Sequence, residues 1–334
     1  MARRKVERPA VSASLPIWIG VDIGGTKTAV ALSSALPQVN ARISFPTLPA
    51  RGPDRAIALI ESSIEAILAS RAARGRDLKG IGVSCGGPLD RLRGVIQSPP
   101  NLPGWNDIPI TEILSRRFGV RARLENDANA GAVAEYRHGA GRGCGSTVFF
   151  TMGTGFGAGI ILDGLLVRGA CELAGEIGHV RLTRRGPVGH GKSGSAEGWV
   201  SGGGVAQVAR EAAETARKRG VRTALARILR ARGEITARDV GVAARGGDLV
   251  ARAVIRSTGQ RLGRVLAIVV DILNPERIVI GGLALRMGDA LLDPAREVIK
   301  REALATSARA CKVVPAALGE RIGDVAALCV AKGI

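Results

Sequence analysis

The residues from Asp22 to Lys27 combine an acid, two glycines, a hydroxyl and an ammonium directly after a short apolar run. Because glycine lacks a Cβ atom, Gly24 and Gly25 would let backbone amides approach phosphate oxygens closely. Thr26 can donate a hydrogen bond to such an oxygen, and Lys27 can neutralise its charge. This combination is typical of a loop that binds the phosphates of a nucleotide.

The acid at the start of this segment suggests a metal ion. An ionised Asp22 only accepts hydrogen bonds, so it would repel phosphate unless a cation lay between them, and Mg²⁺ is the usual cation. The alternative is a tight β-hairpin turn, for which Gly-Gly is a common signal. These six residues alone leave both interpretations open.

A second glycine-rich segment follows the apolar residues 147–150 and precedes the apolar residues 160–162. Glycines at alternate positions beside a threonine hydroxyl suit a hairpin whose amides face phosphates. No helix follows directly, which excludes a Rossmann loop. A purely structural hairpin bend is the alternative. The candidate phosphate contacts are Thr151, Gly153, Thr154, Gly155 and Gly157.

A third pattern, at residues 186–193, matches the Walker A formula G-x4-G-K-S letter for letter. A Walker A loop works only if a helix begins at the lysine and presents its N-terminus to the phosphates. Glycines at 194, 198 and 202–204 follow Lys192, so we expect no helix of useful length there. A P-loop nucleotide site is therefore the disfavoured interpretation.

Carboxylates that could exchange protons occur at Glu125-Asn126-Asp127 and at Glu172 and Glu176. Asp127 follows a predicted strand, so it could accept the proton of an attacking hydroxyl while Asn126 orients the alcohol. Asp127 could equally cap a helix that begins at residue 128.

Glu176 and His179 enclose Ile177 and Gly178, and His179 is one of three histidines in the chain. A metal ligand, a substrate hydrogen-bonding group and a structural histidine are the possible roles. Zinc requires further ligands, and residues 180–200 contain no cysteine and one other histidine, His190. The sequence therefore argues against a metal at this position.

Bulk composition restricts the class of protein. The chain has 334 residues, of which 46% are hydrophobic and 3% aromatic, so it can form about two domains with aliphatic cores. Its five cysteines are dispersed, as expected of reduced thiols in a cytoplasmic protein. Each of the most apolar stretches is interrupted by polar residues or glycines, so we expect no membrane span.

The net charge of +19 raises the possibility of a nucleic-acid partner. The excess comes mainly from arginines spread along the chain, and few aromatic residues are available to stack on bases. We therefore expect an arginine-rich solvated surface, which would also attract an anionic substrate such as a nucleotide, and no nucleic-acid partner.

Periodicity predicts an α/β protein in which strands and helices alternate. Expected strands lie at 17–22, 28–33, 40–45, 80–84, 120–124, 146–152, 160–162 and 277–280. Expected helices lie at 53–68, 109–118 and 323–332, and a short helix opens the second half; residues 165–204 should be loop-rich. Gly87 lies in a turn after the strand at 80–84, and ligands bind at such strand ends in open sheets.

These elements suggest two lobes. Residues 1–16 should form a disordered basic tail, residues 17–125 a small N-terminal α/β lobe and residues 126–322 a large α/β lobe. The large lobe contains a mostly helical insertion at 204–273, and the last helix, in residues 323–334, could complete the small lobe. No simple internal repeat is visible.

Taken together, these motifs resemble the ROK family of sugar kinases and related repressors, in the actin-like/hexokinase ATPase superfamily. The resemblance covers nearly the whole chain after residue 16 and keeps the order of the motifs. It implies a two-lobed, ribonuclease H-like fold with a cleft between the lobes. Residues 22–27 and 153–159 resemble the two phosphate motifs, and Gly281 and Gly282 the adenosine-side motif.

The resemblance also implies roles for the polar residues. Asp127 aligns with the catalytic aspartate, and Glu176 and His179 with residues that line the sugar pocket. Further sugar contacts implied are Gly87, Asn101, Asn126 and Glu197. The cofactors would be ATP and Mg²⁺, the latter placed by Asp22, and the assembly would be a homodimer.

One departure concerns zinc, because many family members carry a cysteine-rich zinc loop where residues 189–195 contain no cysteine. We expect no structural zinc, and sugar specificity is the least secure inference. The repressors of the family carry a helix-turn-helix domain, for which 16 residues before the first strand are too few. We therefore expect an ATP-dependent kinase of a hexose hydroxyl, with a non-catalytic sugar sensor as the alternative.

Overall fold

The computed structural model describes residues 15–333. The disordered tail expected at 1–16 mostly falls outside the described residues. Its last two positions, Leu15 and Pro16, belong instead to the first strand, where Leu15 pairs with Arg76. No helix among the described residues combines the length and the apolar character that a membrane crossing requires.

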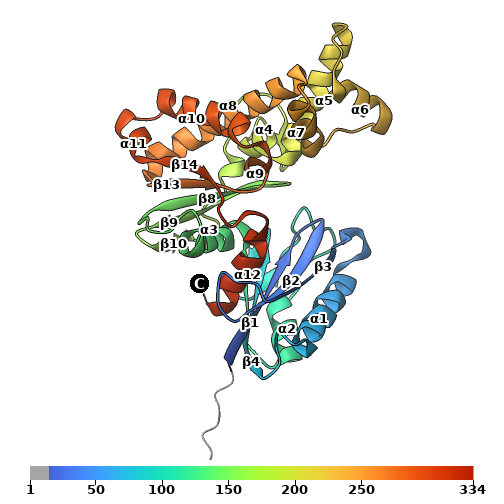
Figure 1. Cartoon of the computed structure of the whole chain (residues 1–334), viewed down its shortest axis with the longest axis vertical. Helices are drawn as coiled ribbons and strands as arrows, with labels where there is room; N and C mark the ends of the chain where they lie inside the picture. Colours follow the sequence, from blue (N-terminus) through green and yellow to red (C-terminus); the bar gives the residue numbers. More distant parts are fainter. Residues whose placement is uncertain (1–14, 334) are drawn as a thin grey trace, which may run out of the picture.

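The first half of the chain forms a five-stranded mixed sheet in the order β3-β2-β1-β4-β7 (Figure 1). Strand β1 pairs antiparallel with β2 and parallel with β4, and β7 adds parallel to β4. All five strands expected in this half are present. They are β1 (Leu15–Ile23), β2 (Lys27–Ser33), β3 (Ala41–Pro46), β4 (Arg76–Cys85) and β7 (Ala122–Asn126).

The second half repeats this topology, which the sequence did not reveal. Its sheet has the order β10-β9-β8-β13-β14, with the first three strands antiparallel and the last two parallel to β8. β10 and β14, of three and four residues, were not predicted. The strands are β8 (Thr147–Met152), β9 (Phe156–Leu162), β10 (Leu165–Val167), β13 (Arg277–Ile280) and β14 (Lys312–Pro315).

Helices and two small hairpins complete the two halves. The helices near the first sheet are α1 (Pro53–Ala69) and α2 (Ile110–Phe118), and α3 (Asp127–His138) packs on β8 and β9. Later helices are α9 (Leu283–Met287), α10 (Asp289–Glu302), α11 (Ala305–Ala310) and α12 (Ile322–Lys332). The hairpins pair β5 (Leu89–Asp90) with β6 (Val95–Ile96), and β11 (Val188–Gly189) with β12 (Lys192–Ser193).

The helical segment begins earlier than the expected residue 204. It consists of α4 (Ala196–Val200), α5 (Gly202–Lys218), α6 (Ala224–Arg232), α7 (Ala237–Arg245) and α8 (Leu249–Leu273). The glycines at 202–204 were interpreted as helix breakers, but they form the first turn of α5, which the Ser201 hydroxyl caps. A Cβ atom at Gly204 would lie 2.0 Å from the Gly198 carbonyl oxygen, so close packing requires glycine there.

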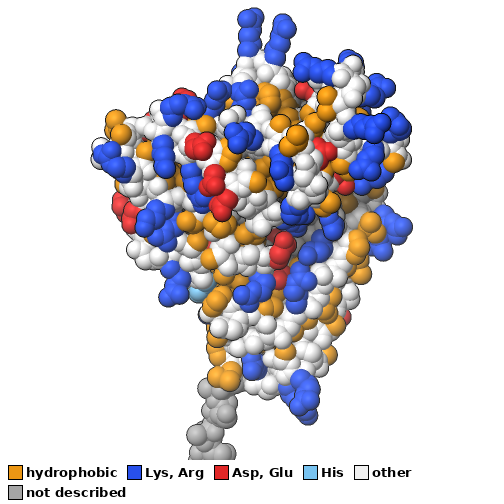
Figure 2. Space-filling view, turned by 45° about the horizontal axis from the view of Figure 1, so that its top comes forward, with side chains coloured by type: hydrophobic (Ala, Val, Ile, Leu, Met, Phe, Trp, Pro, Cys, Tyr) orange, Lys and Arg blue, Asp and Glu red, His pale blue; other side chains and the backbone are white. Residues whose placement is uncertain are grey.

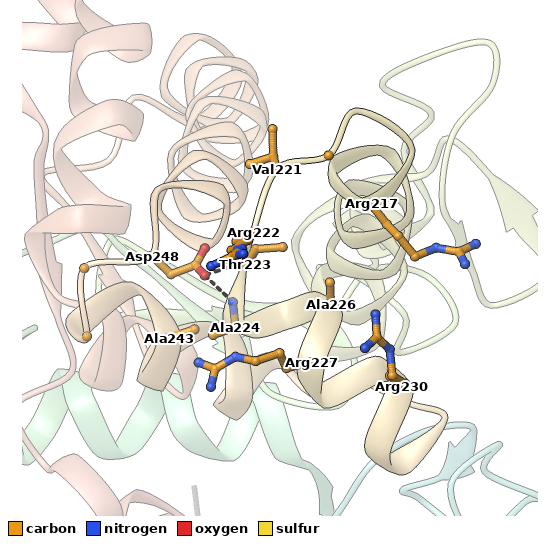
Figure 3. Close-up of a pocket in the computed structure, with 13 residues that line it drawn as sticks. Arg217, Val221, Arg222, Thr223, Ala224, Ala226, Arg227, Arg230, Ala243 and Asp248 are labelled. Atoms are coloured by element: carbon orange, nitrogen blue, oxygen red, sulfur yellow. Dashed lines mark hydrogen bonds between the residues drawn. The ribbon is translucent and has the colours of Figure 1, made fainter.

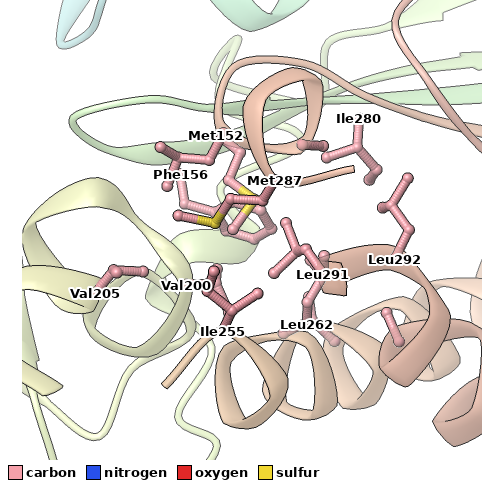
Figure 4. Close-up of a cluster of buried hydrophobic side chains, with 14 of the residues drawn as sticks. Met152, Phe156, Val200, Val205, Ile255, Leu262, Ile280, Met287, Leu291 and Leu292 are labelled. Atoms are coloured by element: carbon pink, nitrogen blue, oxygen red, sulfur yellow. The ribbon is translucent and has the colours of Figure 1, made fainter. Parts of the chain in front are cut away.

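Aliphatic side chains dominate the core of the second half, as the low aromatic content predicted. Met152 and Phe156 from the second sheet meet Ile255 and Leu262 from α8 (Figure 4). The only stacked aromatic pair among the described residues joins Phe150 and Phe156, with ring centroids 5.2 Å apart.

Helix α12 brings the end of the chain back to the first sheet, where it packs on β1 and β4 and also on α3 (Figure 1). Two glycines make this contact possible. A Cβ atom at Gly82 would lie 2.2 Å from both the Ala327 oxygen and the Ala331 nitrogen, and one at Gly20 would lie 2.7 Å from the Leu328 nitrogen. The helix backbone therefore rests directly on the sheet.

We predict that Gly82→Ala lowers the stability of the protein by about 3 kcal/mol, because its methyl group would push α12 off the sheet. Gly241→Ala is the matched control. Gly241 lies inside α7, and its Cβ atom would meet only the end of Arg245 at 3.6 Å, so the change should stabilise by about 0.5–1 kcal/mol. Urea unfolding curves of the two variants measure both effects. Equal midpoints for Gly82→Ala and wild type would contradict the packing argument.

Candidate active site

The parallel strands β1, β4 and β7 end at the same edge of the first sheet, and each end carries a candidate functional residue. Asp22 lies near the end of β1, Gly87 follows β4, and Asn126 closes β7. The topology of the sheet therefore brings together residues that lie far apart in the sequence, as expected for strand ends that bind ligands.

A cavity of about 850 Å³ lies at this edge, between the two halves of the chain. Fourteen predicted site residues line it. They are Gly24, Gly25, Gly87, Asn101, Asn126, Asp127, Thr151, Gly153, Thr154, Gly155, Gly157, Glu176, His179 and Glu197. Five others, namely Asp22, Thr26, Lys27, Gly281 and Gly282, do not line the cavity.

The first glycine motif is a hairpin turn between β1 and β2, so the hairpin interpretation of this segment is correct. The Gly24 amide donates to the Lys27 carbonyl at 3.1 Å. A Cβ atom at Gly25 would lie 2.8 Å from the Asn101 carbonyl oxygen. The turn therefore packs against the loop that carries Asn101, and a hairpin of this kind is compatible with a phosphate contact.

The second glycine motif is the equivalent hairpin of the repeated topology, between β8 and β9. The Gly153 amide donates to the Gly155 carbonyl at 3.1 Å. Gly282, after β13, packs against this turn, since a Cβ atom there would lie 2.1 Å from the Met152 carbonyl oxygen. Gly282, expected with Gly281 on the adenosine side, is thus adjacent to the second turn although neither glycine lines the cavity.

Asn126, and not Asp127, is the N-cap of α3. Its Oδ1 accepts hydrogen bonds from the amides of Ala128 at 2.9 Å and Asn129 at 3.3 Å. Asp127 occupies the first helical position, where its Oδ1 accepts from the Ala128 amide at 2.8 Å. Because Asn126 provides the cap, the second carboxylate oxygen of Asp127 is available to a substrate.

Carboxylates are crowded around Asp22. Burial, the neighbouring Asp127 and the neighbouring Asp324 raise the pKa of Asp22 to about 7. Asp324 itself pairs with Arg42 at 2.7 Å. Gly323, at the start of α12, lies so close that a Cβ atom would be 2.1 Å from Asp22 Oδ2. Burial also raises the pKa of Asp127, and Glu176 contributes in the same direction.

Glu172 was a candidate proton-exchange residue, but the structure assigns it to an ion-pair network. It accepts a hydrogen bond from Arg91, which lowers the pKa of Glu172, and it lies 3.5 Å from Arg168 Nε. Arg168 also donates to buried Glu125 at 3.0 Å. Arg91 and Glu125 belong to the first half of the chain, whereas Arg168 and Glu172 belong to the second. These ion pairs therefore join the two halves.

Glu197 lies beside the second glycine turn, where its Oε2 accepts from the Phe156 amide at 3.1 Å. The imidazole rings of His179 and His190 meet edge to face, with centroids 4.8 Å apart. The sequence analysis did not assign His190 to the site. It adopts a left-handed backbone conformation, with φ at 46°, that directs it to the cavity.

Asn129 is a second residue that sequence reasoning missed. It lies three positions after Asn126, on the same side of α3, and this spacing was the available signal. Its Nδ2 donates to Glu125 at 3.3 Å, while its buried Oδ1 has no hydrogen-bond partner among the described residues. A buried acceptor without a partner in a cavity wall is suited to a substrate hydroxyl.

The Walker A formula has no structural counterpart. Lys192 lies in the two-residue strand β12, and its Nζ donates to the His179 carbonyl at 2.7 Å. No helix begins there, as expected. Within residues 15–333, no group of three or more His, Cys, Asp or Glu side chains is placed to hold a metal ion.

Comparison with known proteins agrees with the two-lobed geometry. A glucokinase from Halalkalibacterium halodurans is 32% identical over 310 residues, 92% of each chain. An N-acetylmannosamine kinase from Salmonella typhi is 30% identical over 285 residues, 85% of this chain and 88% of the relative.

Among solved structures, a ROK glucokinase from Streptomyces griseus, in complex with glucose and AMPPNP, superposes with a TM-score of 0.78. It is 31% identical and covers 95% of this chain and 99% of that one. The predicted actin-like ATPase fold is therefore confirmed.

The ROK family model matches residues 18–334, nearly the whole chain. Its span includes both glycine hairpins, the aspartate at the start of α3 and the Glu-x-Gly-His segment, which are the residues that gather around the cavity. This protein belongs to the ROK family, and within it resembles the glucokinases.

Proposed function

We propose that the protein transfers the γ-phosphoryl group of ATP to a hexose hydroxyl, with the 6-hydroxyl of glucose or a related aldose as the preferred acceptor. The position of Asp127 carries this proposal, because its carboxylate lines the cavity together with both glycine turns. Similarity over 95% of the chain to a glucokinase solved with glucose and AMPPNP supports the same assignment.

The chemistry follows from the protonation and position of Asp127. As general base it would accept the proton of the attacking hydroxyl, and its raised pKa brings it closer to the operating pH. Asn101, Glu176, His179 and Glu197 would bind the sugar hydroxyls from the surrounding walls. The second glycine turn would bind the nucleotide phosphates through its backbone amides.

The carboxylates near Asp22 fit a Mg²⁺ ion bound together with the nucleotide. Mg²⁺ is usually held by one or two carboxylates and by substrate phosphates. Burial is the main cause of the raised pKa of Asp22, and the charges of Asp127 and Asp324 add to it, so a cation bound with the nucleotide would stabilise the ionised form of Asp22. When bound there, Mg²⁺ would neutralise charge on the transferred phosphoryl group. Asp22 is the residue we propose to hold it, through water.

Closure of the two halves over the sugar would exclude water and limit ATP hydrolysis. The ion pairs from Arg168 to Glu125 and from Arg91 to Glu172 join the two halves and would support the closed state. We further infer a cytoplasmic homodimer without a structural zinc or a nucleic-acid partner, as the family resemblance and the composition suggest.

Asp127→Asn should lower kcat by about 10²–10⁴, because an amide cannot accept the proton of the sugar hydroxyl. Glucose affinity should stay within a few-fold of wild type, since the amide keeps the shape of the carboxylate. A coupled ADP-release assay gives kcat, and calorimetry gives the affinity. Asp163→Asn, in the exposed turn between β9 and β10, is the control and should leave kcat unchanged. A wild-type kcat for Asp127→Asn would refute the assignment.

Asp22→Asn should change the pH dependence of stability in the ligand-free protein. The pKa of Asp22 is about 7 in the folded state and near 3.8 when unfolded, so between these values only the folded state holds the proton. The free energy of unfolding of wild type therefore falls as pH rises through this window. We expect urea unfolding in EDTA to show that the free energy of unfolding of Asp22→Asn, relative to that of wild type, is higher at pH 8 than at pH 5. If the free energy of unfolding depended on pH identically in the two proteins, the raised pKa of Asp22 would be contradicted.

Glucose should stimulate ADP release more than N-acetylmannosamine, N-acetylglucosamine, mannose, fructose or allose when the sugars are compared at equal concentration. The measurement is the same coupled assay, with ATP hydrolysis in the absence of sugar as the baseline. Stronger stimulation by another hexose would identify that hexose as the preferred acceptor and leave the proposed kinase reaction unchanged. Stimulation by none of the sugars would favour the sensor interpretation over the kinase.

A further inference from the structure

A second hollow lies in the helical segment, away from the cavity between the two halves. It has a volume of about 880 Å³, within the range of small-molecule sites, and is bordered by α6, the end of α5 and the turn between α7 and α8 (Figure 3). It shares no lining residue with the candidate active site. The proposed kinase reaction assigns it no role.

Four arginines line this hollow. Arg217 comes from the last turn of α5, Arg222 from the connection, and Arg227 and Arg230 from α6. In Figure 3, Arg217 and Arg230 lie on one side, whereas Arg222 and Arg227 lie toward Asp248 and Ala243. All four side chains are exposed, so they retain conformational freedom to converge on a ligand.

The single acid of the hollow, Asp248, is already engaged by the protein. Its Oδ2 accepts from the Thr223 hydroxyl at 2.7 Å and the Ala224 amide at 2.5 Å, and its Oδ1 accepts from the Ala251 amide at 2.9 Å. It thereby caps the first turns of α6 and α8. Although burial opposes them, these hydrogen bonds lower the pKa of Asp248. Its charge stabilises helix termini and pairs with none of the four arginines.

The four guanidinium groups of the hollow differ from a neighbouring arginine in their lack of partners among the described residues of the protein. Arg232, the last residue of α6, makes two parallel contacts with Asp239 at 3.0 and 3.1 Å. Within residues 15–333, the arginines of the hollow have no ion pair or side-chain hydrogen bond. Four arginines and one engaged aspartate leave a concave surface with an excess of three positive charges.

We propose that this hollow binds a small ligand that carries an oligophosphate group, meaning two or more linked phosphates. Guanidinium groups bind phosphate oxygens in pairs, and several linked phosphates can engage arginines on both sides of the hollow at once. Val221, Ala226 and Ala243 form apolar parts of the wall that could contact a nucleoside attached to the phosphates.

Dispersed surface charge does not explain this arrangement. Lysine and arginine side chains are scattered over the face of the molecule in Figure 2, whereas here four arginines line one concavity. A nucleic-acid groove would require aromatic residues for stacking, and no aromatic residue lines the hollow. The observations therefore favour a compact oligophosphate over a nucleic-acid strand.

The test is calorimetric titration of the full chain with inorganic tripolyphosphate in 150 mM NaCl. Three proteins are compared, namely wild type, Arg227→Ala/Arg230→Ala and the control Arg71→Ala/Arg74→Ala. The control removes two exposed arginines that lie outside the hollow, so it matches the change in net charge. Tripolyphosphate that enters the active-site cavity would contribute equally to all three proteins.

We expect Arg227→Ala/Arg230→Ala to weaken tripolyphosphate binding at least tenfold, and the control to stay within twofold of wild type. Both double variants should keep wild-type melting temperature and kinase activity, which separates this proposal from the proposed function. Equal weakening of tripolyphosphate binding in the two double variants would show that binding depends on the net charge of the protein and not on the hollow, and it would overturn the proposal. Unchanged binding in Arg227→Ala/Arg230→Ala would also overturn it.

The source of the phosphates is distinguished by a second titration with ADP and ATP. Binding that depends on Arg227 and Arg230 and is tighter for ATP than for tripolyphosphate identifies a nucleotide. Tighter binding of tripolyphosphate identifies a free oligophosphate. A single-stranded oligonucleotide that binds through the same two arginines more tightly than either would replace the proposal with a nucleic-acid surface.

Discussion

The direct contact between α12 and the glycines of the first sheet is the constraint on which the rest of the structure depends. Gly20 and Gly82 let the helix backbone rest on β1 and β4, and no side chain could occupy these positions without moving it. The same helix packs on α3, which carries Asp127, and its first residues lie against Asp22. One close approach therefore positions Asp22 and the proposed base relative to each other.

The repeated topology explains why a glycine turn from each half lines the cavity. Each half begins with an antiparallel hairpin whose turn is rich in glycine, and each turn faces the cavity between the halves. A nucleotide bound there would meet backbone amides from both sides. Burial and crowding of carboxylates at the same edge raise the pKa of Asp22, and strongly shifted pKa values of this kind cluster at functional sites.

Charge is organised differently in the two parts of the molecule. Beside the cavity, which Glu172 lines, Arg91 and Arg168 are paired with glutamates, and these pairs join the two halves. In the hollow of the helical segment, four arginines outnumber one acid, and that aspartate, Asp248, is used to cap helices. The net charge of +19 therefore does not indicate one function, because arginine forms structural ion pairs beside the cavity and, within the described part of the chain, is unpaired in the hollow.

The resemblance to the ROK family pointed to most of the residues that gather around the cavity. The sequence by itself determined the glycine turns, most strands of both sheets and the final helix. These signals are local, since glycines, helix caps and apolar periodicity act over a few residues. Only the tertiary structure showed that Asn126 caps α3, that Glu172 belongs to an ion-pair network and that the glycines at 202–204 begin a helix. It also revealed the repeated topology and the contact of Gly82 with Ala327. The ion-pair network and the contact of Gly82 with Ala327 join residues that lie far apart in the sequence, so packing decides them. The caps of α3 and α5 are short-range contacts, but the sequence was equally consistent with Asp127 as the cap and with the glycines as helix breakers, and the folded structure decides between such local alternatives.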